Sequence, residues 1–420
     1  MRSSKYIRSF LSAFLLCTGA AWGETAADFN ALGVEAYNGK RWDEAIQHFA
    51  RAYELAKDNP TVRRNLCNAY QAQSNELARS NDFQTATDLL TLAISVDPEN
   101  ASPLVQLGSY YLHLDMNNDA VFRLAEAVQL DPTNLDAQEL LGDAYYKQND
   151  LASALAQWES VREVQPNRPS LQGKLQKAYR EEGVEGGFNK SASAHFEISY
   201  KDGTNGVDLG KTLQILERAY REIGRKTGGV YPATPIQVVA YTAPDFARST
   251  LLGEHVGAVY DGKIRVPIRD AQGKLLPEEE LTRRLYHEYT HCVIRFWAGS
   301  NVPWWFNEGL AETFSTELTA ADTQLLEEAS AQGALFPLAT LEEGQLQKLT
   351  PEQLQVAYRQ SHATVHYLWN RYGQRGLASM MEQLQNGASH EESLVASYRT
   401  NYELLERDVS LSFGRMLSKR

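Results

Sequence analysis

The sequence has few cysteines, no excess of basic charge and only one long apolar run. Its 420 residues include three cysteines, so stability must come from packing and not from a disulfide framework. The 41 lysines and arginines are outnumbered by 53 aspartates and glutamates, which gives a formal net charge of -12. Gripping a phosphate backbone needs a basic face, so no nucleic-acid partner is expected. The length predicts two or three domains.

The single long apolar run lies at the amino terminus and has the pattern of a targeting segment. Three basic residues precede the apolar stretch from Phe10 to Ala20, and small residues flank Trp22. This pattern predicts a signal peptide over residues 1–23, with an uncleaved N-terminal anchor as the alternative. No later stretch reaches the roughly 18 apolar residues of a membrane helix. We therefore expect an exported chain with no transmembrane span after maturation, periplasmic in a Gram-negative cell and otherwise secreted.

The first half contains a repeat with a period of about 34 residues. Small residues and a closing proline return after one period: Gly108 as Gly142, Ala120 as Ala154, and Pro132 as Pro166. The pattern resembles the tetratricopeptide repeat, which implies antiparallel helix pairs stacked into a solenoid that can bind a protein partner. We expect about four repeats and a closing helix over residues 24–182, because a single repeat cannot bury its own apolar face.

The last repeat carries a strip of polar residues on the side expected to be concave. These residues are Asp136, Glu139, Asp143 and Tyr146. Such a strip suits a basic or amine-bearing segment of a protein partner. Charge on an exposed helix face is also ordinary, so a solvated face is the alternative interpretation.

A change of pattern predicts a domain boundary in the middle of the chain. Residues 183–194 are rich in Gly and Ser and break the helical periodicity. Alternating apolar residues then predict strands over 195–200 and 236–241, with an amphipathic helix from Asp208 to Thr227 between them. We therefore expect an all-α solenoid followed by an α+β domain over residues 195–420.

A hairpin and a long helix are expected next in this second domain. Asp261-Gly262 lies between two short apolar runs, which predicts a two-residue turn near Tyr260. The edge of this hairpin either binds an extended peptide through backbone hydrogen bonds or is covered by other parts of the chain. A helix is expected from about Pro277 to Trp297.

That helix contains the segment His287-Glu288-Tyr289-Thr290-His291. Two histidines four residues apart lie on one face of a helix, where their rings can converge on one Zn²⁺ ion. Glu288 follows the first histidine and can reach a water at the metal. Cys292 is directed about 100° around the helix from His291, so it is expected to be a small buried residue and not a ligand.

A second helix is expected from the segment Pro303-Trp304-Trp305-Phe306-Asn307-Glu308-Gly309-Leu310-Ala311-Glu312. Together the two segments resemble the gluzincin metallopeptidases, and the region from His195 onward is similar to the peptidase MA-like domain family. The resemblance implies that Glu308 is the third zinc ligand. It also implies that Glu312 orients a ligand histidine through the other ring nitrogen.

The same resemblance implies hydrolysis of a protein or peptide substrate with one Zn²⁺ per chain and Glu288 as general base. A Tyr-x-x-Ser pattern favours Tyr358 as the donor to the oxyanion, with His362 or His366 as second choices. His362 and His366 are also four residues apart, which fits either a second metal site or a polar helix face.

Two classes of function follow from these expectations. In the first, the chain is an exported zinc metallopeptidase whose repeats recruit a substrate or partner. In the second, it is a non-catalytic scaffold in which the repeats bind a partner and a zinc-stabilised peptidase-like domain supports them. The complete set of ligands and the base favours the enzyme.

Overall fold

A computed structural model describes residues 25–413, apart from residues 202, 204–205, 253–256 and 344–347. The predicted signal peptide, residues 1–23, lies outside the described residues. The chain divides into two compact units between Gln106 and Leu107. The second unit therefore contains the later repeats together with the α+β domain.

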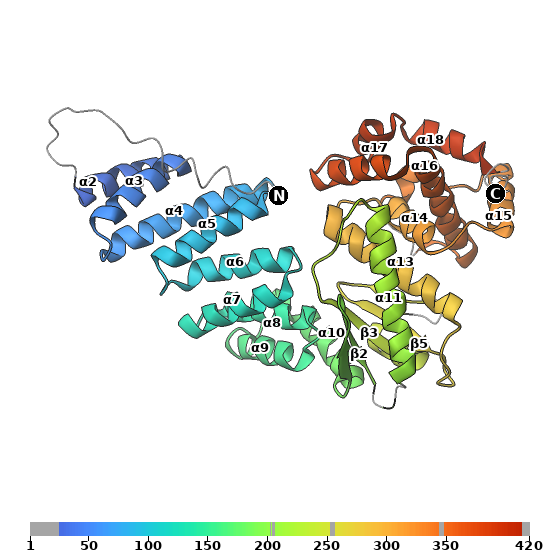
Figure 1. Ribbon diagram of the computed structural model, residues 1–420, viewed down its shortest axis with the longest axis horizontal. Coiled ribbons are helices and arrows are strands. Elements are labelled where there is room, and N and C mark those ends of the chain that lie inside the picture. The colour runs from blue at the N-terminus through green and yellow to red at the C-terminus, as the bar shows by residue number, and fades with distance from the viewer. Residues whose placement is uncertain (1–24, 202, 204–205, 253–256, 344–347, 414–420) are drawn as a thin grey trace. The chain divides into compact units, whose positions relative to one another are not determined.

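The first unit consists of antiparallel helix pairs (Figure 1). Helix α2 (Ala26–Asn38) packs on α3 (Trp42–Leu55), and α4 (Pro60–Arg79) packs on α5 (Phe83–Val96). Gly33 lies where α2 and α3 cross, and a Cβ there would stand 2.5 Å from the ring of Phe49. The small residues of the repeat are thus required by the close approach of the paired helices.

The second unit continues the repeats from within α6 (Ala101–His113) to the closing helix α10 (Pro169–Glu185). Between them lie α7 (Asn117–Leu130), α8 (Leu135–Lys147) and α9 (Leu151–Val164). Gly142 of α8 allows the same close crossing, because a Cβ there would stand 2.4 Å from Nε1 of the buried Trp158. Within this unit, antiparallel helix pairs precede the helix α10.

A five-stranded sheet follows, with strand order β1-β2-β3-β5-β4. Its strands are β1 (Asn189–Ala192), β2 (Phe196–Tyr200), β3 (Ile236–Thr242), β4 (Val259–Tyr260) and β5 (Ile264–Arg269). The three central strands are parallel, and the two edge strands pair antiparallel to them. The predicted hairpin is present as β4 and β5, and Gly262 in its turn has a φ of 102°. The expected linker, residues 183–194, contains the end of α10 and strand β1.

The two faces of this sheet are covered by different kinds of helix. One face is apolar and packs under α11 (Gly206–Lys226) and α13 (Glu278–Ala298). The other face is covered by α12 (Ala243–Thr250) and by the repeat helix α10, whose carboxylates bind Arg265 of β5. Lys263 and Arg265 are fully buried there. The last repeat helix is therefore part of the core of the second unit.

The remaining helices pack beside α13. They are α14 (Trp304–Ser315), α15 (Ala320–Ala331), the short 3-10 helix η1 (Leu338–Leu341), α16 (Pro351–Gln385), α17 (His390–Tyr398) and α18 (Tyr402–Ser410). Helix α14 packs against both α13 and α16. Gly309 permits the second contact, since a Cβ there would stand 2.3 Å from the backbone oxygen of Ser361. This close crossing brings α16 to the centre described below.

The predicted fold class is confirmed: helical repeats precede a domain of helices and a small mixed sheet. Among the described residues, no helix has the length and apolar character needed to cross a bilayer.

Candidate metal centre

The three predicted ligands lie together where α13 and α14 meet. His287 and His291 lie one helical turn apart on α13, with ring centroids 4.7 Å from each other. Oε2 of Glu308 on α14 lies 3.4 Å from Nε2 of His287 and 3.6 Å from Nε2 of His291. The three side chains are only 12–13% exposed. In the part of the chain that the structure describes, they form the one cluster of three ligand side chains suited to a metal ion.

The donor atoms fit a zinc ion in both type and spacing. Two imidazole nitrogens and one carboxylate oxygen form a common protein ligand set of catalytic zinc, which leaves a fourth position free. Ligands at about 2.1 Å in a tetrahedron stand about 3.4 Å from one another. The two separations from Glu308, 3.4 and 3.6 Å, match this value. The side chains are therefore arranged for a metal ion that would lie between them.

The charges in the cluster also favour a cation. Burial acts to raise the pKa of Glu308, but His291 and His287 hold it well below its ordinary value. Burial acts to lower the pKa of His291, and the Glu308 carboxylate more than offsets this effect, so the pKa is raised to about 9. A proton on His291 thus compensates the carboxylate when no metal is bound. A metal ion would take the place of that proton.

Glu288, the predicted base, lies beside the ligands and is almost fully buried. Burial raises the pKa of its carboxyl group, while the neighbouring His287 and His291 act to lower it. A backbone hydrogen bond from Tyr260 of β4 also reaches this carboxylate. A carboxyl group with a raised pKa beside a metal site is suited to accept and return a proton near neutral pH.

Residues of α14 lie beside the second ring nitrogen of both candidate ligand histidines. Nδ1 of His291 lies 3.0 Å from Oδ1 of Asn307. Since that amide oxygen can only accept, Nδ1 carries the proton and the lone pair on Nε2 faces the cluster. Oε1 of Glu312 lies 3.4 Å from Nδ1 of His287, a nitrogen that has no hydrogen bond within the described part of the chain.

Glu312 is itself fixed by a cation from α16. Nη1 of Arg359 donates to Oε2 of Glu312 at 3.0 Å, and Nε of Arg359 lies 3.1 Å from Asp322 on α15. The arginine thus links three helices around the centre. It also offsets one of the carboxylates gathered there.

The three candidates for the oxyanion donor occupy different positions. Tyr358 has Glu308, Glu312 and Glu288 as its charged neighbours, which together with burial raise the pKa of its hydroxyl. His362 is completely buried, and neither of its ring nitrogens has a hydrogen-bond partner among the residues that the structure describes. Burial lowers the pKa of His366, whose charged neighbour is Glu317. Of the three, Tyr358 is the one whose charged neighbours include both Glu308 and Glu288.

The acidic strip of the last repeat has partners within the chain. Lys174 of α10 binds Glu139 and Asp143 at 2.7 and 2.6 Å, and Arg168 binds Asp136 and Glu139. The fourth residue, Tyr146, donates to Glu181 of α10 at 3.0 Å. The basic segment that this strip was expected to receive is therefore the closing helix of the same chain. Asp136 remains largely exposed, and Glu139 is buried.

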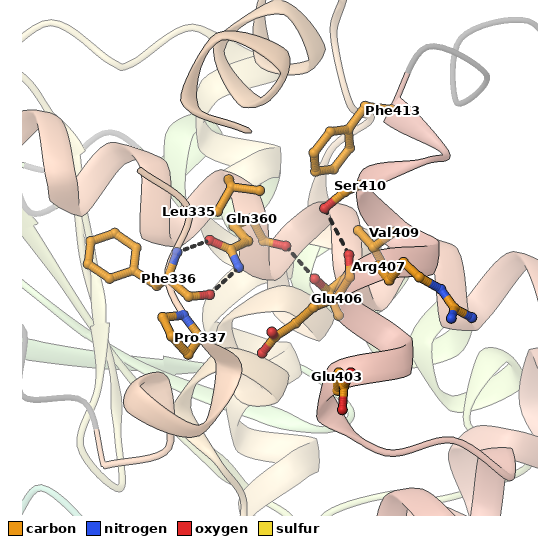
Figure 2. Close-up of a pocket in the computed structure, with 11 residues that line it drawn as sticks. Leu335, Phe336, Pro337, Gln360, Glu403, Glu406, Arg407, Val409, Ser410 and Phe413 are labelled. Atoms are coloured by element: carbon orange, nitrogen blue, oxygen red, sulfur yellow. Dashed lines mark hydrogen bonds between the residues drawn. The ribbon is translucent and has the colours of Figure 1, made fainter. Parts of the chain in front are cut away.

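A separate pocket lies between α16, η1 and α18 (Figure 2). The side-chain amide of Gln360 accepts a hydrogen bond from the backbone N–H of Phe336 and donates one to its backbone oxygen. The carboxylates of Glu403 and Glu406 line the opposite side of the pocket. None of the three ligand residues lines this pocket. Cys292 is buried as expected, and burial raises the pKa of its thiol to about 12.

Sequence reasoning assigned no role to Asn307, Gly309, Asp322 or Arg359. Asn307 and Gly309 flank Glu308 in the Asn-Glu-Gly segment. An amide beside the candidate ligand could have indicated a hydrogen bond to a histidine ring, and the glycine a close crossing of two helices. Arg359 follows Tyr358 directly, but nothing local indicates that it reaches α14. Asp322 lies in an ordinary helix-capping position at the start of α15 and gave no signal.

Comparison with known proteins agrees with this geometry. Residues 224–412 match the family described as Peptidase MA superfamily. Residues 115–178 match the tetratricopeptide repeat. The first match contains all three ligands and Glu288, and the second covers the later repeats.

Individual relatives resemble the repeats. A DnaJ homolog subfamily C member 7 homolog of Dictyostelium discoideum is 25% identical over 155 residues, which are 35% of this chain and 29% of that protein. The crystal structure of MamA protein is 22% identical, with 38% of this chain and 84% of that chain covered and a TM-score of 0.32. The tetratricopeptide domain of P58(IPK) is 12% identical, with 94% and 81% covered and a TM-score of 0.28. This chain therefore carries tetratricopeptide repeats followed by a domain of the Peptidase MA superfamily.

Proposed function

We propose that this protein is a zinc-dependent metallopeptidase. The observation that carries the proposal is the spacing of the Glu308 carboxylate from the two histidine Nε2 atoms, 3.4 and 3.6 Å, with the buried Glu288 beside them. Ligand set, spacing and base all suit hydrolysis of a peptide bond. His287, His291 and Glu308 would hold one Zn²⁺ per chain.

The chain's own groups have distinct roles in this reaction. A bound zinc ion supplies Lewis acidity, which polarises a carbonyl and makes a water easier to deprotonate. Glu288 takes the proton from the attacking water and passes it to the leaving amine, a task that its raised pKa suits. Asn307 and Glu312 keep the ring nitrogens of His291 and His287 facing the metal position.

Tyr358 is the proposed donor to the negative charge that develops on the carbonyl oxygen. Its hydroxyl keeps its proton because burial and three nearby carboxylates raise its pKa. A neutral donor held in a partly dry site stabilises an oxyanion strongly. His362 is unsuited to this role because its side chain is fully buried.

The repeats would bring a protein or peptide to the peptidase domain, since tetratricopeptide repeats bind peptides and proteins in other chains. The acidic strip is occupied by α10, so recruitment would use other surfaces of the repeats. Export is part of the same proposal and rests on the amino-terminal pattern of basic, apolar and small residues. Fractionation of cells with N-terminal sequencing of the mature protein tests it, and an intact Met1 in the cytoplasm would contradict it.

The decisive test compares the wild type with Glu288→Gln on a denatured protein and on a peptide library. We expect both proteins to hold one zinc by metal analysis, and the variant to cleave about 10³-fold more slowly. Equal cleavage by both proteins would reject Glu288 as the base. Stoichiometric zinc without cleavage by either would favour the scaffold, with a zinc-stabilised peptidase-like domain.

A further inference from the structure

The β4–β5 hairpin lies between the repeat helix α10 and the metal-centre helix α13. Its turn residue Asp261 contacts α10, and its strand β4 packs against α13. All these elements belong to the second compact unit. The hairpin is therefore a direct physical link between the repeats and the proposed base.

On the side of the metal centre, Tyr260 makes two contacts with α13. Its backbone hydrogen-bonds to the carboxylate of Glu288, and its phenol donates to the thiol of Cys292. The phenol contact fixes the strand along the helix, and the backbone contact reaches the group proposed to move the proton. A shift of β4 would change the position and the hydrogen bonding of Glu288.

On the side of the repeats, Asp261 accepts hydrogen bonds from two cations. Nζ of Lys177 on α10 lies 2.7 Å from Oδ2, and Nε of Arg265 lies 3.1 Å from Oδ1. Arg265 also binds Glu181 and Glu185 of α10, so it holds β5 against that helix. Lys177 is the residue of α10 that binds the turn residue Asp261 directly, whereas Lys263, the first residue after the turn, binds Asn149 of the repeats at 2.7 Å.

Helix α10 is a rigid support for this contact. Its Glu181 and Glu185 are buried and bind Arg265 at 2.8 and 2.9 Å. On the neighbouring side, Lys174 joins α10 to α8, and Arg180 donates to the backbone oxygen of Ser249 on α12 at 2.9 Å. Because α10 is held by these several contacts, we expect its position to determine the position of the hairpin turn, and not the reverse.

We propose that Lys177 is a positioning residue for the peptidase reaction, acting through Asp261 and the Tyr260 backbone on Glu288. This inference rests on the proposed function, because it assigns Glu288 the role of base. In it, the last repeat helix holds the edge of the catalytic site in place, so the repeats take part in the reaction as well as in recruitment.

The structure supplies a matched control. The side chain of Lys177 is 39% exposed, and in Lys177→Met its two partners, Asp261 and Glu181, still pair with Arg265. Lys190 on β1 is 42% exposed and binds Glu197 at 2.8 Å at the opposite edge of the sheet. Lys190→Met therefore removes a similarly exposed ion pair, together with a hydrogen bond to the backbone oxygen of Gln148, and neither contact involves the hairpin.

The test combines hydrogen exchange with kinetics on the zinc-loaded full chain. In Lys177→Met we expect amides of residues 259–265 to exchange about tenfold faster. We expect kcat to fall about fivefold, with KM and zinc content unchanged. Lys177→Arg restores both values, Asp261→Asn reproduces both losses, and the double variant of Lys177→Met with Asp261→Asn is no worse than either single one. Lys190→Met matches the wild type in both measurements.

Two results would overturn the inference. Unchanged exchange at the hairpin in Lys177→Met would show that the contact does not hold it. Faster exchange with an unchanged kcat would show that the hairpin does not position Glu288. Exchange does not depend on turnover, so an inactive wild type would reject the proposed peptidase while the exchange comparison still decides whether Lys177 holds the hairpin.

Discussion

The second unit buries two clusters of charged side chains, and their charges are balanced in different ways. Between α10 and the sheet, Glu181 and Glu185 meet Arg265 and Lys263. At the metal centre, the ion pairs of Glu308 are with two histidines, His287 and His291, and not with a lysine or an arginine. In the first cluster, both carboxylates pair with the guanidinium of Arg265 at 2.8 and 2.9 Å.

The difference indicates which cluster serves chemistry and which serves structure. A buried charge is costly unless an opposite charge compensates it. Around the metal position, Glu288, Glu308 and Glu312 gather near Arg359, whose charge is shared between Glu312 and Asp322. A divalent ion would balance negative charge that this arginine leaves uncompensated. The structural cluster needs no such addition.

The largest expected effect comes from removing a ligand at the metal centre. Glu308→Gln takes away the one anionic ligand, and we expect the purified protein to lose its zinc and to cleave at least about 10³-fold more slowly. Metal analysis and peptide cleavage measure the two losses. Glu288→Gln serves as the control, because it slows cleavage but keeps zinc. Stoichiometric zinc in Glu308→Gln would remove this residue from the ligand set.

The next largest effect concerns the structural cluster. Arg265→Met leaves Glu181 and Glu185 buried without their cation, and we expect the free energy of unfolding to fall by about 3–5 kcal/mol. Urea-induced unfolding of the zinc-loaded protein measures it. Lys190→Met, an exposed pair on the same sheet, should cost about 0–1 kcal/mol. Replacing both glutamates by Leu in the Arg265→Met background should recover most of the loss, and a further loss would contradict the charge argument.

A smaller effect is expected from the groups behind the ligands. Glu312→Gln and Arg359→Met disturb the support of His287, and we expect zinc affinity to weaken about 10-fold to 100-fold. Competition with a metal chelator measures the affinity. Arg359→Lys keeps the charge but not the double contact with Glu312 and Asp322, so it should lie between the wild type and Arg359→Met. Unchanged affinity in Glu312→Gln would mean that His287 needs no support.

The smallest effect is expected for His362. This buried side chain belongs to neither of the two clusters compared above. Burial lowers the pKa of His362 to about 3 from 6.5, with His366, Arg359 and His287 acting in the same direction and Asp322 against it. Its neutral form therefore stabilises the fold above pH 6.5, and this contribution is lost as the pH falls toward 3. At pH 5.5 the loss is about 1.5 kcal/mol.

His362→Phe removes this titration. We expect the fall in unfolding free energy between pH 7 and pH 5.5 to be smaller in the variant by that amount, measured by urea unfolding at both values. The matched variant His390→Phe changes a partly exposed histidine on α17 that pairs with Glu342. Equal pH dependence in His362→Phe and the wild type would contradict the assignment.

The residues that could be predicted from the sequence are those whose geometry is local. The spacing of His287 and His291 already fixes their common helical face, and Glu288 lies between them in the sequence. Small residues such as Gly142 recur because every repeat has the same helix crossing. Glu308 lies on a different helix and was accessible through the Asn-Glu-Gly segment that resembles a known family.

Contacts between distant segments could not be predicted. Lys263 and Arg265 alternate with apolar residues, as in a strand with one face in water, but α10 covers that face. The expected boundary at 183–194 followed from composition, whereas the compact units divide between Gln106 and Leu107. The local composition indicates only where the chain is free of regular helical periodicity. It gives no information on the hydrogen bonds between α10 and β5, which join residues about 80 positions apart.

The sequence by itself determined the repeat, the central strands and the main helices of the second domain, and the common face of His287 and His291, because each depends on periodicity or on short spacing. Only the tertiary structure decided how those side chains are supported. Arg359 reaches Glu312 because Gly309 lets α16 approach α14, and Glu288 meets the Tyr260 backbone because the hairpin packs on α13. Such pairings arise when separate elements bury their faces against one another, and no local pattern encodes which faces meet.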